Sequence, residues 1–377
     1  MRVLIATVTA GAGHVAAAAA LEEAWRAWRP RDVLERLDLV KFFSTLHRKI
    51  VSDGYVKLVE HAPELWGMMF AKTDSPKRAE RLNQLKRLLP SNSRTRFARH
   101  LRQFQPDAVL CTHYFPLETL SLLRRKPDGL RPLVASIVTD FEAHALWMED
   151  CVDLYCVAAA QTRARLIARG AAADRVIATG IPISARFSNR AEPKAVRKML
   201  GLRDDLPVLL VLSGGFGMGP VAEIVAALDR TQRQFQTVVV TGHNEELRRE
   251  LAAQNRQHPT HVLGFASNMH ELMAVADLII SKPGGLTTSE LLALGKPLFI
   301  VSPIPGQEAA NSDFLLEGGA AAKVNRVEDL PFRLEQLLGS RALAGMARAA
   351  KGLGRPNAAR AICEAVVQRV EAQSVPA

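Results

Sequence analysis

Short apolar runs alternate with longer stretches of helical periodicity along almost the whole chain. The apolar runs consist largely of Val, Leu, Ile and Ala, which is typical of strands buried on both faces of a parallel sheet. Helical patterns fill the gaps, so the sequence predicts an α/β fold with helices on both faces of open parallel sheets. The predicted strands are residues 3–7, 32–37, 108–112, 133–138, 154–157 and 175–178, followed by 207–212, 236–241, 261–263, 278–280, 297–301 and 321–324.

The alternation breaks once, after residues 179–183, where a polar and charged stretch extends to Asp205. A chain of 377 residues is long enough for two domains. We therefore predict two doubly wound domains, residues 1–185 and 205–353, and a helical tail over 354–377. Two such sheets that face each other form a cleft, and ligands of open α/β sheets bind beyond the carboxyl ends of the strands. The loops that follow the strands are thus the candidate functional segments.

The first such loop is Gly11-Ala12-Gly13-His14, which leads into an alanine-rich helix. The two glycines permit a sharp turn or a close approach of a ligand to the backbone. Gly11, Gly13 and Ala16 also fit a dinucleotide fingerprint, which leaves an NAD-type enzyme, with Asp38 as the ribose acid, as an alternative. The fingerprint does not explain His14, whose imidazole is suited to take a proton from a hydroxyl group.

A second polar loop follows the strand that ends at residue 138. It begins with Thr139-Asp140 and continues to His144 and Trp147. Asp140 can orient His14 or replace it as the base, and the sequence leaves both possibilities open. His144 and Trp147 are candidates for contact with an acceptor, although either side chain can equally serve a structural purpose.

In the second half, the loop at 213–220 follows the first strand and precedes a helix. Several glycines at a strand-to-helix turn expose backbone N–H groups, and a helix N-terminus favours an anion. No Lys-Ser/Thr follows, so the loop is not a Walker motif. It predicts contact with a phosphate. The residues concerned are Ser213, Gly214, Gly215, Gly217 and Gly219.

The strongest pattern is SKPGGLTTSE at residues 281–290, where a buried strand runs through Pro-Gly-Gly into a helix. Its N–H groups and hydroxyls converge where a diphosphate can lie. Glu290 can either complement the helix dipole or accept hydrogen bonds from a ribose diol. The segment PGQEAAN at 305–311 follows, and its Gln307, Glu308 and Asn311 suit sugar hydroxyls.

Together with the GAGH loop, these motifs resemble those of the monogalactosyldiacylglycerol synthase and processive diacylglycerol glucosyltransferase family, glycosyltransferase family 28. A more remote resemblance links them to the peptidoglycan N-acetylglucosaminyltransferase that acts on a lipid-linked precursor. That enzyme tends to carry Gln-Gln where this chain has Gln307-Glu308, and a longer N-terminal glycine loop; both differences favour the diacylglycerol branch. The resemblance spans roughly residues 1–325.

The resemblance implies a GT-B type fold, that is, two Rossmann-like domains that face a cleft, with a UDP-sugar in the second domain and a lipid acceptor in the first. It implies inverting transfer of glucose or galactose to diacylglycerol, with no cofactor and no metal at the active site. It places Phe265 and Met269 near the uracil and Glu290 at the ribose. The expected diphosphate ligands are the loop 213–219 with Gly284 and Gly285, the expected hexose ligands are Gln307, Glu308 and Asn311, and Asn244 and Thr287 complete the candidate donor site.

The distribution of charge along the chain predicts a membrane surface as a further partner. Of the net charge of +11, the first hundred residues contribute +8, from 18 basic and 10 acidic side chains. The densest basic run lies at 72–102, beside an apolar segment that contains Trp66 and Phe70. This combination predicts binding to an anionic membrane surface, with Arg78 and Arg81 among the contacts. The same charge can attract nucleic acid, and an ordinary solvated helix is the third possibility; of these we favour the membrane and expect no nucleic-acid partner.

Other features limit the class of protein. No apolar run approaches the length of a membrane-spanning helix, and the chain starts directly with a strand rather than a leader, so we expect a peripheral protein on the cytoplasmic face of the membrane. Cys111, Cys151, Cys156 and Cys363 have no metal or redox spacing and are expected to be buried thiols. A transferase that uses UDP-N-acetylglucosamine with another lipid, and a non-enzymatic regulator that binds a nucleotide sugar, remain as alternatives.

Overall fold

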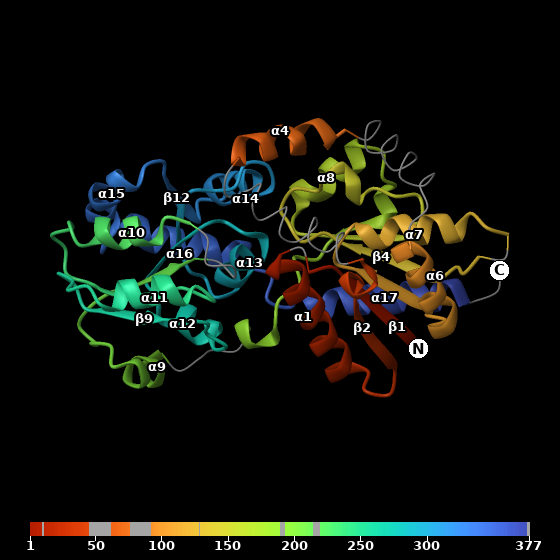
Figure 1. Ribbon diagram of the computed structural model, residues 1–377, viewed down its shortest axis with the longest axis horizontal. Coiled ribbons are helices and arrows are strands. Elements are labelled where there is room, and N and C mark those ends of the chain that lie inside the picture. Colours follow the sequence, from red (N-terminus) through yellow and green to blue (C-terminus); the bar gives the residue numbers. More distant parts are fainter. Residues whose placement is uncertain are drawn as a thin grey trace. The chain divides into compact units, whose positions relative to one another are not determined.

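The computed structural model describes residues 1–9, 11–44, 62–75, 92–127, 129–188, 193–213 and 219–374. The chain forms two compact units (Figure 1). The first unit comprises Met1–Ala185, Pro305–Gln307 and Asn357–Ala377, and the second comprises Arg186–Ile304 and Glu308–Pro356. Each unit is built around a six-stranded parallel sheet, so the predicted α/β architecture with two doubly wound sheets is confirmed.

In the first unit the strand order is β2-β1-β3-β4-β5-β6. Its strands are β1 (Arg2–Thr7), β2 (Val33–Asp38), β3 (Ala108–Cys111), β4 (Leu133–Ile137), β5 (Leu154–Val157) and β6 (Val176–Ala178). Its helices are α1 (Ala12–Trp28), η1 (Leu39–Phe42), α4 (Pro63–Thr73), α6 (Asn92–Phe104), α7 (Phe115–Arg124), η2 (Ala145–Trp147), α8 (Ala160–Ala168), η3 (Ala173–Arg175) and α17 (Ala358–Ser374).

Alternate residues of the central strands of this unit enter two different cores. In β1, Val3 and Ile5 pack in one cluster with residues of α1 and α17, whereas Leu4 and Ala6 pack in another with residues of α6 and α7. Side chains along a strand point alternately to opposite faces, so a strand covered by helices on both sides must be apolar throughout. This explains why the strands read as continuous apolar runs.

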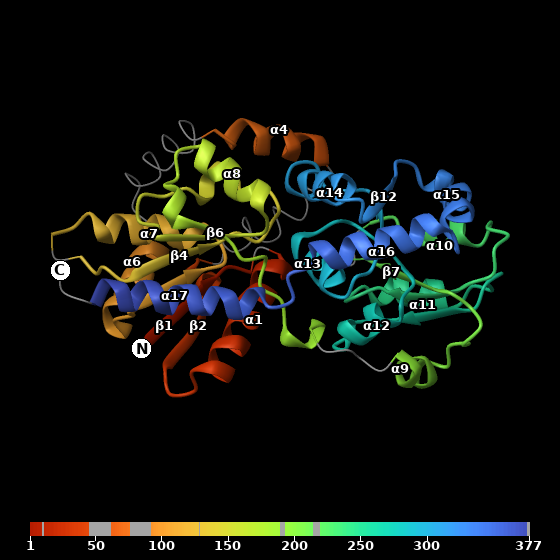
Figure 2. The ribbon, with the colours of Figure 1, turned by 180° about the vertical axis from the view of Figure 1, so that it is seen from behind.

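The helix α17, close to the end of the chain, completes the core of the first unit. Ile362, Cys363 and Val366 are fully buried in the cluster that also holds β1 and α1. The guanidinium of Arg360 lies 3.8 Å from the centre of the Trp28 ring on α1. Figure 2 shows α17 beside α1 and across the sheet of this unit. The segment that the sequence assigned to a tail is therefore packed against the opposite end of the chain.

The second unit has the strand order β12-β11-β10-β7-β8-β9. Its strands are β7 (Val208–Leu212), β8 (Gln236–Val240), β9 (Thr260–Leu263), β10 (Leu278–Ser281), β11 (Leu298–Val301) and β12 (Ala321–Val324). Its helices are η4 (Ala185–Phe187), α9 (Pro193–Leu200), α10 (Val221–Leu228), α11 (Glu245–Ala252), α12 (Met269–Val275), α13 (Gly285–Ala293), α14 (Gln307–Glu317), η5 (Val327–Asp329), α15 (Leu330–Leu337) and α16 (Arg341–Leu353).

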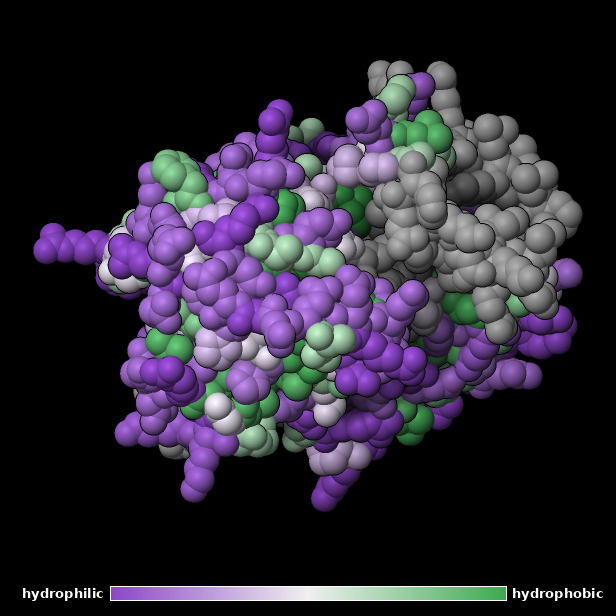
Figure 3. Space-filling model, turned by 60° about the vertical axis from the view of Figure 1, so that its left-hand side comes forward, coloured by the Kyte–Doolittle hydropathy of each residue, from purple (hydrophilic) through white to green (hydrophobic). Residues whose placement is uncertain are grey.

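Hydrophilic residues cover most of the face seen in Figure 3, and hydrophobic residues are scattered among them. Of the helices in the described ranges, none has the length and apolar character needed to cross a membrane. The four cysteines are buried and carry free thiols, as predicted.

Candidate active site

His14 lies in the first turn of α1, directly after β1 and the turn at Gly11. Gly11 has φ 136°, a backbone conformation that side chains other than glycine rarely adopt, so this residue sets the turn. The Nδ1 atom of His14 lies 2.8 Å from the carbonyl oxygen of Thr112 and 3.0 Å from Oγ1 of Thr139. A carbonyl oxygen only accepts, so Nδ1 carries the hydrogen and Nε2 keeps its lone pair. The ring is therefore held in the tautomer that a base acting through Nε2 requires.

The surroundings of His14 also keep the ring uncharged. Burial lowers its pKa to about 4, and the hydrogen bond to the Thr112 carbonyl acts in the opposite direction. His113 meets the ring edge-on at 4.7 Å between centroids, and Trp147 lies 6.4 Å away. His14 is thus neutral at pH 7 and available to accept a proton.

The sequence did not suggest the groups that contact Nδ1 of His14. These are the carbonyl oxygen of Thr112 and the hydroxyl of Thr139, whereas Asp140 was predicted either to orient His14 or to replace it as the base. Asp140 itself lies next to Thr139 in the loop after β4 and is partly exposed, so its role as base or assistant stays a prediction. The pairing of β1 with β3 is the signal that could have identified Thr112, because it brings the ends of these two strands together.

His113 is a further residue that the sequence reasoning missed. It is buried, and its Nδ1 accepts a hydrogen bond of 3.1 Å from the backbone N–H of Phe115 at the start of α7. Burial, and then the proximity of His14, hold its pKa well below the usual value for histidine. Two neutral imidazoles therefore lie side by side at the carboxyl ends of β1 and β3.

His144, a predicted acceptor contact, holds α4 through one ring nitrogen and caps η2 through the other. Its Nδ1 accepts a hydrogen bond of 3.1 Å from the backbone N–H of Leu146, so Nε2 carries the hydrogen and donates to the carbonyl oxygen of Phe70 at 3.1 Å. The Phe70 ring packs on the imidazole with centroids 4.5 Å apart. Directly after α4, Asp74 forms two hydrogen bonds of 2.8 Å with the guanidinium of Arg169. These contacts fix the C-terminal end of α4.

The exposed face of α4 differs from the one that the sequence suggested. Trp66 and Phe70 were the predicted membrane contacts, yet both are half-buried, and their rings lie 6.2 Å apart. The exposed apolar side chains of α4 are Leu65, Met68 and Met69. Trp147, a candidate for contact with a lipid acceptor, is buried beside His14.

In the second unit, the candidate phosphate loop begins at Ser213, whose buried hydroxyl donates to the carbonyl oxygen of Val240 at 3.0 Å. It ends at Gly219, which has φ 121°. A Cβ atom at Gly219 would lie 3.9 Å from Cε of Lys282, so the SKPGG turn lies next to the end of this loop. Five predicted residues fall outside the described ranges: Gly214, Gly215, Gly217, Arg78 and Arg81.

The SKPGG turn leads into α13 without a side-chain cap. Gly284 is the N-cap residue and leaves the first backbone N–H groups of the helix without a side-chain acceptor. Thr287 and Glu290 lie half-buried on this helix, and burial raises the pKa of Glu290 to about 8. An anion at this turn would meet the backbone N–H of Gly285 and the positive end of the helix dipole, whereas the N–H of Gly284 donates to the carbonyl oxygen of Lys282 at 3.0 Å.

The predicted hexose residues surround the same turn. Asn311 is fully buried, and its Nδ2 donates to the carbonyl oxygen of Pro283 at 3.0 Å, which ties α14 to the SKPGG turn. Glu308 accepts a hydrogen bond of 2.7 Å from the backbone N–H of Ile304. Gln307 is the first residue of α14. Asn311 and Glu308 therefore have structural contacts as well as any contact with a sugar.

The predicted base-binding residues lie at the carboxyl ends of β8 and β9. Asn244 caps α11 through a hydrogen bond of 3.0 Å between its Oδ1 and the backbone N–H of Leu247. Phe265 is 66% exposed, and its ring stacks on that of His243. Met269 is half-buried at the start of α12.

The NAD alternative required Asp38 as the ribose acid, but this carboxylate has other partners. It accepts hydrogen bonds from the backbone N–H and the hydroxyl of Thr9, at 3.2 and 2.5 Å, and from the backbone N–H of Val40 at 3.0 Å. Asp38 thus closes the turn after β1 and caps η1. Its local role argues against a ribose ligand at this position.

Two family models together match most of the chain. The monogalactosyldiacylglycerol synthase model matches residues 14–183, and the glycosyltransferase family 28 C-terminal domain matches residues 208–359. The processive diacylglycerol beta-glucosyltransferase of Bacillus pumilus (strain SAFR-032) is 33% identical over 268 residues, which cover 70% of this chain and 69% of the relative. The enzyme of that name from Bacillus thuringiensis (strain Al Hakam) is 29% identical over 381 residues, 100% and 96% of the two chains.

Solved structures share the fold at low sequence identity. MurG of Acinetobacter baumannii aligns with a TM-score of 0.60 and 17% identity over 97% of this chain and 99% of the other. UDP-GlcNAc 2-epimerase of Neisseria meningitidis, solved with UDP-GlcNAc, aligns with a TM-score of 0.63 and 16% identity over 98% and 100%. At these identities the alignments support the two-domain fold alone.

Proposed function

Because the chain belongs to the family of monogalactosyldiacylglycerol synthases and processive diacylglycerol β-glucosyltransferases, we propose that it transfers glucose or galactose from a UDP-sugar to diacylglycerol. Membership confirms the resemblance drawn from the motifs, the GT-B type of fold and the enzyme class, a hexosyltransferase. The observation that carries the proposal is His14 in a chain of this family: its imidazole is neutral, and within the described ranges no hydrogen bond engages Nε2, which can accept a proton.

In the proposed reaction the hydroxyl of diacylglycerol attacks the anomeric carbon from the face opposite UDP. The new carbon–oxygen bond forms as the bond to the diphosphate breaks, and the hydroxyl proton moves to Nε2 of His14. The configuration at the sugar carbon is inverted, so an α-linked donor gives a β-linked lipid. The low pKa of His14 favours rapid return of this proton to water after each turnover.

The departing UDP gains negative charge, which the second unit is suited to stabilise. Backbone N–H groups at the start of α13, from Gly285 onward, supply hydrogen bonds and the positive end of a helix dipole. We assign the uracil to Phe265 and Met269 and the ribose to Glu290. Gln307, Glu308 and Asn311 are the hexose candidates, of which Glu308 and Asn311 also hold local structural contacts.

The proposed reaction can be tested by comparing several UDP-sugars as donors. The purified protein is mixed with vesicles that contain diacylglycerol and with UDP-glucose, UDP-galactose or UDP-N-acetylglucosamine, and the lipid products are resolved by mass and linkage. We expect a β-hexosyl lipid from glucose or galactose. A product from UDP-N-acetylglucosamine alone, or no glycolipid together with stabilisation by NAD, would contradict the proposal.

The raised pKa of Glu290 predicts that UDP binding depends on pH. At pH 7 the carboxyl is mostly protonated, because burial raises its pKa to about 8, whereas a ribose diol donates hydrogen bonds to a carboxylate. The dissociation constant of UDP should therefore fall by up to about tenfold between pH 7 and pH 9, as the ionised fraction rises. Calorimetry over this range, in buffers of different ionisation heat, also counts the protons released. Glu290→Gln should remove the dependence; an equal pH response in this variant would assign it to another group.

We propose that the first unit holds the protein on the cytoplasmic face of an anionic membrane. Leu65, Met68 and Met69 are exposed on α4, whose end is fixed by His144 and Asp74. Exposed arginines at 96, 99 and 102 follow one side of α6. Insertion of the apolar side chains of α4 and attraction of the basic side chains to anionic lipids are the two contributions that we expect.

Vesicle sedimentation can separate the apolar contribution of α4 from the electrostatic contribution of the basic side chains. Binding should require anionic lipid and weaken as salt increases, because exposed charges are screened. The double variant Met68→Ser with Met69→Ser should weaken binding by at least about tenfold, since two apolar side chains no longer enter the bilayer. Met199→Ser is the matched control, because Met199 is an exposed methionine on α9 of the second unit. Equal losses in both variants would contradict the role of α4.

A further inference from the structure

Two exposed aromatic rings stack on each other at the carboxyl edge of the second sheet. His243 lies in the turn after β8, and Phe265 lies in the turn after β9, the strand that pairs with β8. The ring centroids are 4.6 Å apart and the planes differ by 16°. Phe265 nevertheless remains 66% exposed, so the part of the second unit that the structure describes leaves apolar surface of the stack uncovered.

The backbone of the turns after β8 and β9 brings the two rings into contact. Gly242 has φ 62°, which reverses the chain just before His243, and Asn244 just after it caps α11. On the other side, a Cβ atom at Gly264 would lie only 3.1 Å from Oε1 of Glu245 in the first turn of α11. The absence of a side chain at Gly264 therefore lets the β9 turn approach α11 closely and sets Phe265 over His243.

The exposed stack of His243 and Phe265 can bind a planar group. Ligands of open α/β sheets bind at this edge, and aromatic rings stack on nucleobases because every base has a flat π-face. A third ring placed on the stack would cover apolar surface that is now in contact with water. The turns after β8 and β9 are also distinct from the SKPGG turn, where the diphosphate is assigned.

We propose that His243 is a positioning residue, which holds the ring of Phe265 as a flat platform for the nucleobase of the sugar donor. The inference rests on the proposed function, since it takes the base to be that of UDP. His243 acts through Phe265: its ring limits the rotation of the phenyl group and so lowers the loss of side-chain freedom when the base binds.

The proposal is tested by calorimetric titration of the full chain with UDP and, separately, with inorganic pyrophosphate, which lacks the base. His243→Ala should raise the dissociation constant of UDP by about two- to tenfold, the range that an aromatic pair contributes. The dissociation constant of pyrophosphate should be the same in this variant as in the wild type. His243→Phe should restore UDP affinity, because a phenyl ring can stack in the same place. In turnover assays the loss should appear in KM for the donor and not in kcat.

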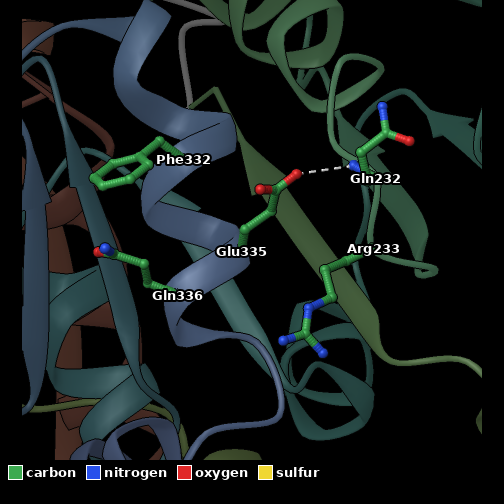
Figure 4. Close-up of a pocket in the computed structure, with 5 residues that line it drawn as sticks. All are labelled: Gln232, Arg233, Phe332, Glu335 and Gln336. Carbon is green, nitrogen blue, oxygen red and sulfur yellow. Dashed lines mark hydrogen bonds between the residues drawn. The ribbon is translucent and has the colours of Figure 1, made fainter.

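Coupling between the two rings gives a second measurement. In a Phe265→Ala background, His243→Ala should have almost no further effect on UDP affinity, because its action depends on Phe265. Phe332→Ala is the matched control. This phenylalanine is 63% exposed on α15 and lines an open depression of about 400 Å³ with Gln232, Arg233, Glu335 and Gln336 (Figure 4). It should leave UDP binding unchanged.

Three results would overturn the role of His243, and a fourth would contradict the proposed function instead. Unchanged UDP affinity in His243→Ala would overturn the proposal, and so would an additive loss in the double variant. A loss in His243→Phe as large as in His243→Ala would assign the effect to an imidazole nitrogen and would also overturn it. A wild-type protein that binds pyrophosphate but not UDP would instead contradict the proposed function.

Discussion

Replacement of His14 by alanine should lower turnover by about 10²–10⁴-fold, the range lost with a general base. The neutral ring presents Nε2 because Nδ1 donates to the carbonyl oxygen of Thr112. UDP should still bind to His14→Ala with the affinity of the wild type, because the residues assigned to the uracil, the ribose and the diphosphate lie in the other unit. Steady-state kinetics with a saturating donor, together with calorimetry of UDP, separate the two effects.

The pH profile provides an independent check. An ordinary histidine titrates near pH 6.5, but burial lowers the pKa of His14 to about 4. The ring is protonated, and so inactive as a base, only below this value. With a saturating donor, so that the titration of Glu290 does not enter, kcat should therefore stay constant as the pH falls from 7.5 to 5.5 and should decline only as it approaches about 4.

Asp140→Asn serves as the comparison variant. If His14 is the base, this change should cost less than His14→Ala, because Thr112 and Thr139 already hold Nδ1. Near-normal turnover of His14→Ala with a large loss in Asp140→Asn would move the base to Asp140.

Replacement of Ile362 by alanine should destabilise the first unit by about 2–5 kcal/mol, the usual cost of such a truncation in a packed core. Ile362 on α17 is fully buried against α1 and the sheet. Two compact units need not unfold together, so the loss should appear as a lower transition for one of them. Stabilisation of the other transition by UDP should persist.

The matched control for this variant is Gln368→Ala on the exposed side of the same helix. It should change the free energy of unfolding by no more than about 0.5 kcal/mol. A comparable loss in both variants would mean that α17 contributes through its helical propensity and not through the core. A loss in neither would contradict the packing of α17 on the first unit.

The architecture could be predicted because the central strands of the two sheets are buried on both faces. Continuous apolar runs such as 208–212 and 278–280 therefore indicate buried strands, and the glycines that follow them mark the ligand-binding edge. Strand ends differed by a residue or two: β9 begins at Thr260, whereas the pattern suggested residue 261. Such ends depend on pairing with the neighbouring strand, which the pattern of one segment does not contain.

The details of the candidate site were harder to predict from the sequence, because they depend on which distant segments of the chain come into contact. The partner of His14 is a backbone carbonyl, at Thr112, and a backbone atom leaves no signature in residue types. On α4 the apolar residues surround most of the helix, so their spacing did not indicate that Phe70 packs inward on His144 while Met68 and Met69 face outward. The stack of His243 on Phe265 likewise required knowledge that β8 and β9 are neighbours.

The position of α17 has a consequence for how the protein is made. The ribosome finishes the strands of the first unit by residue 178, but α17, which covers one face of their sheet together with α1, begins only at Ala358. At 5–20 residues per second, synthesis of the intervening chain lasts about 10–40 s. During that time the second unit can fold while the nascent first unit still presents the apolar surface that Ile362 and Val366 later bury. Chaperones that recognise exposed apolar surface therefore have a defined interval, and a defined face, at which to bind the growing chain.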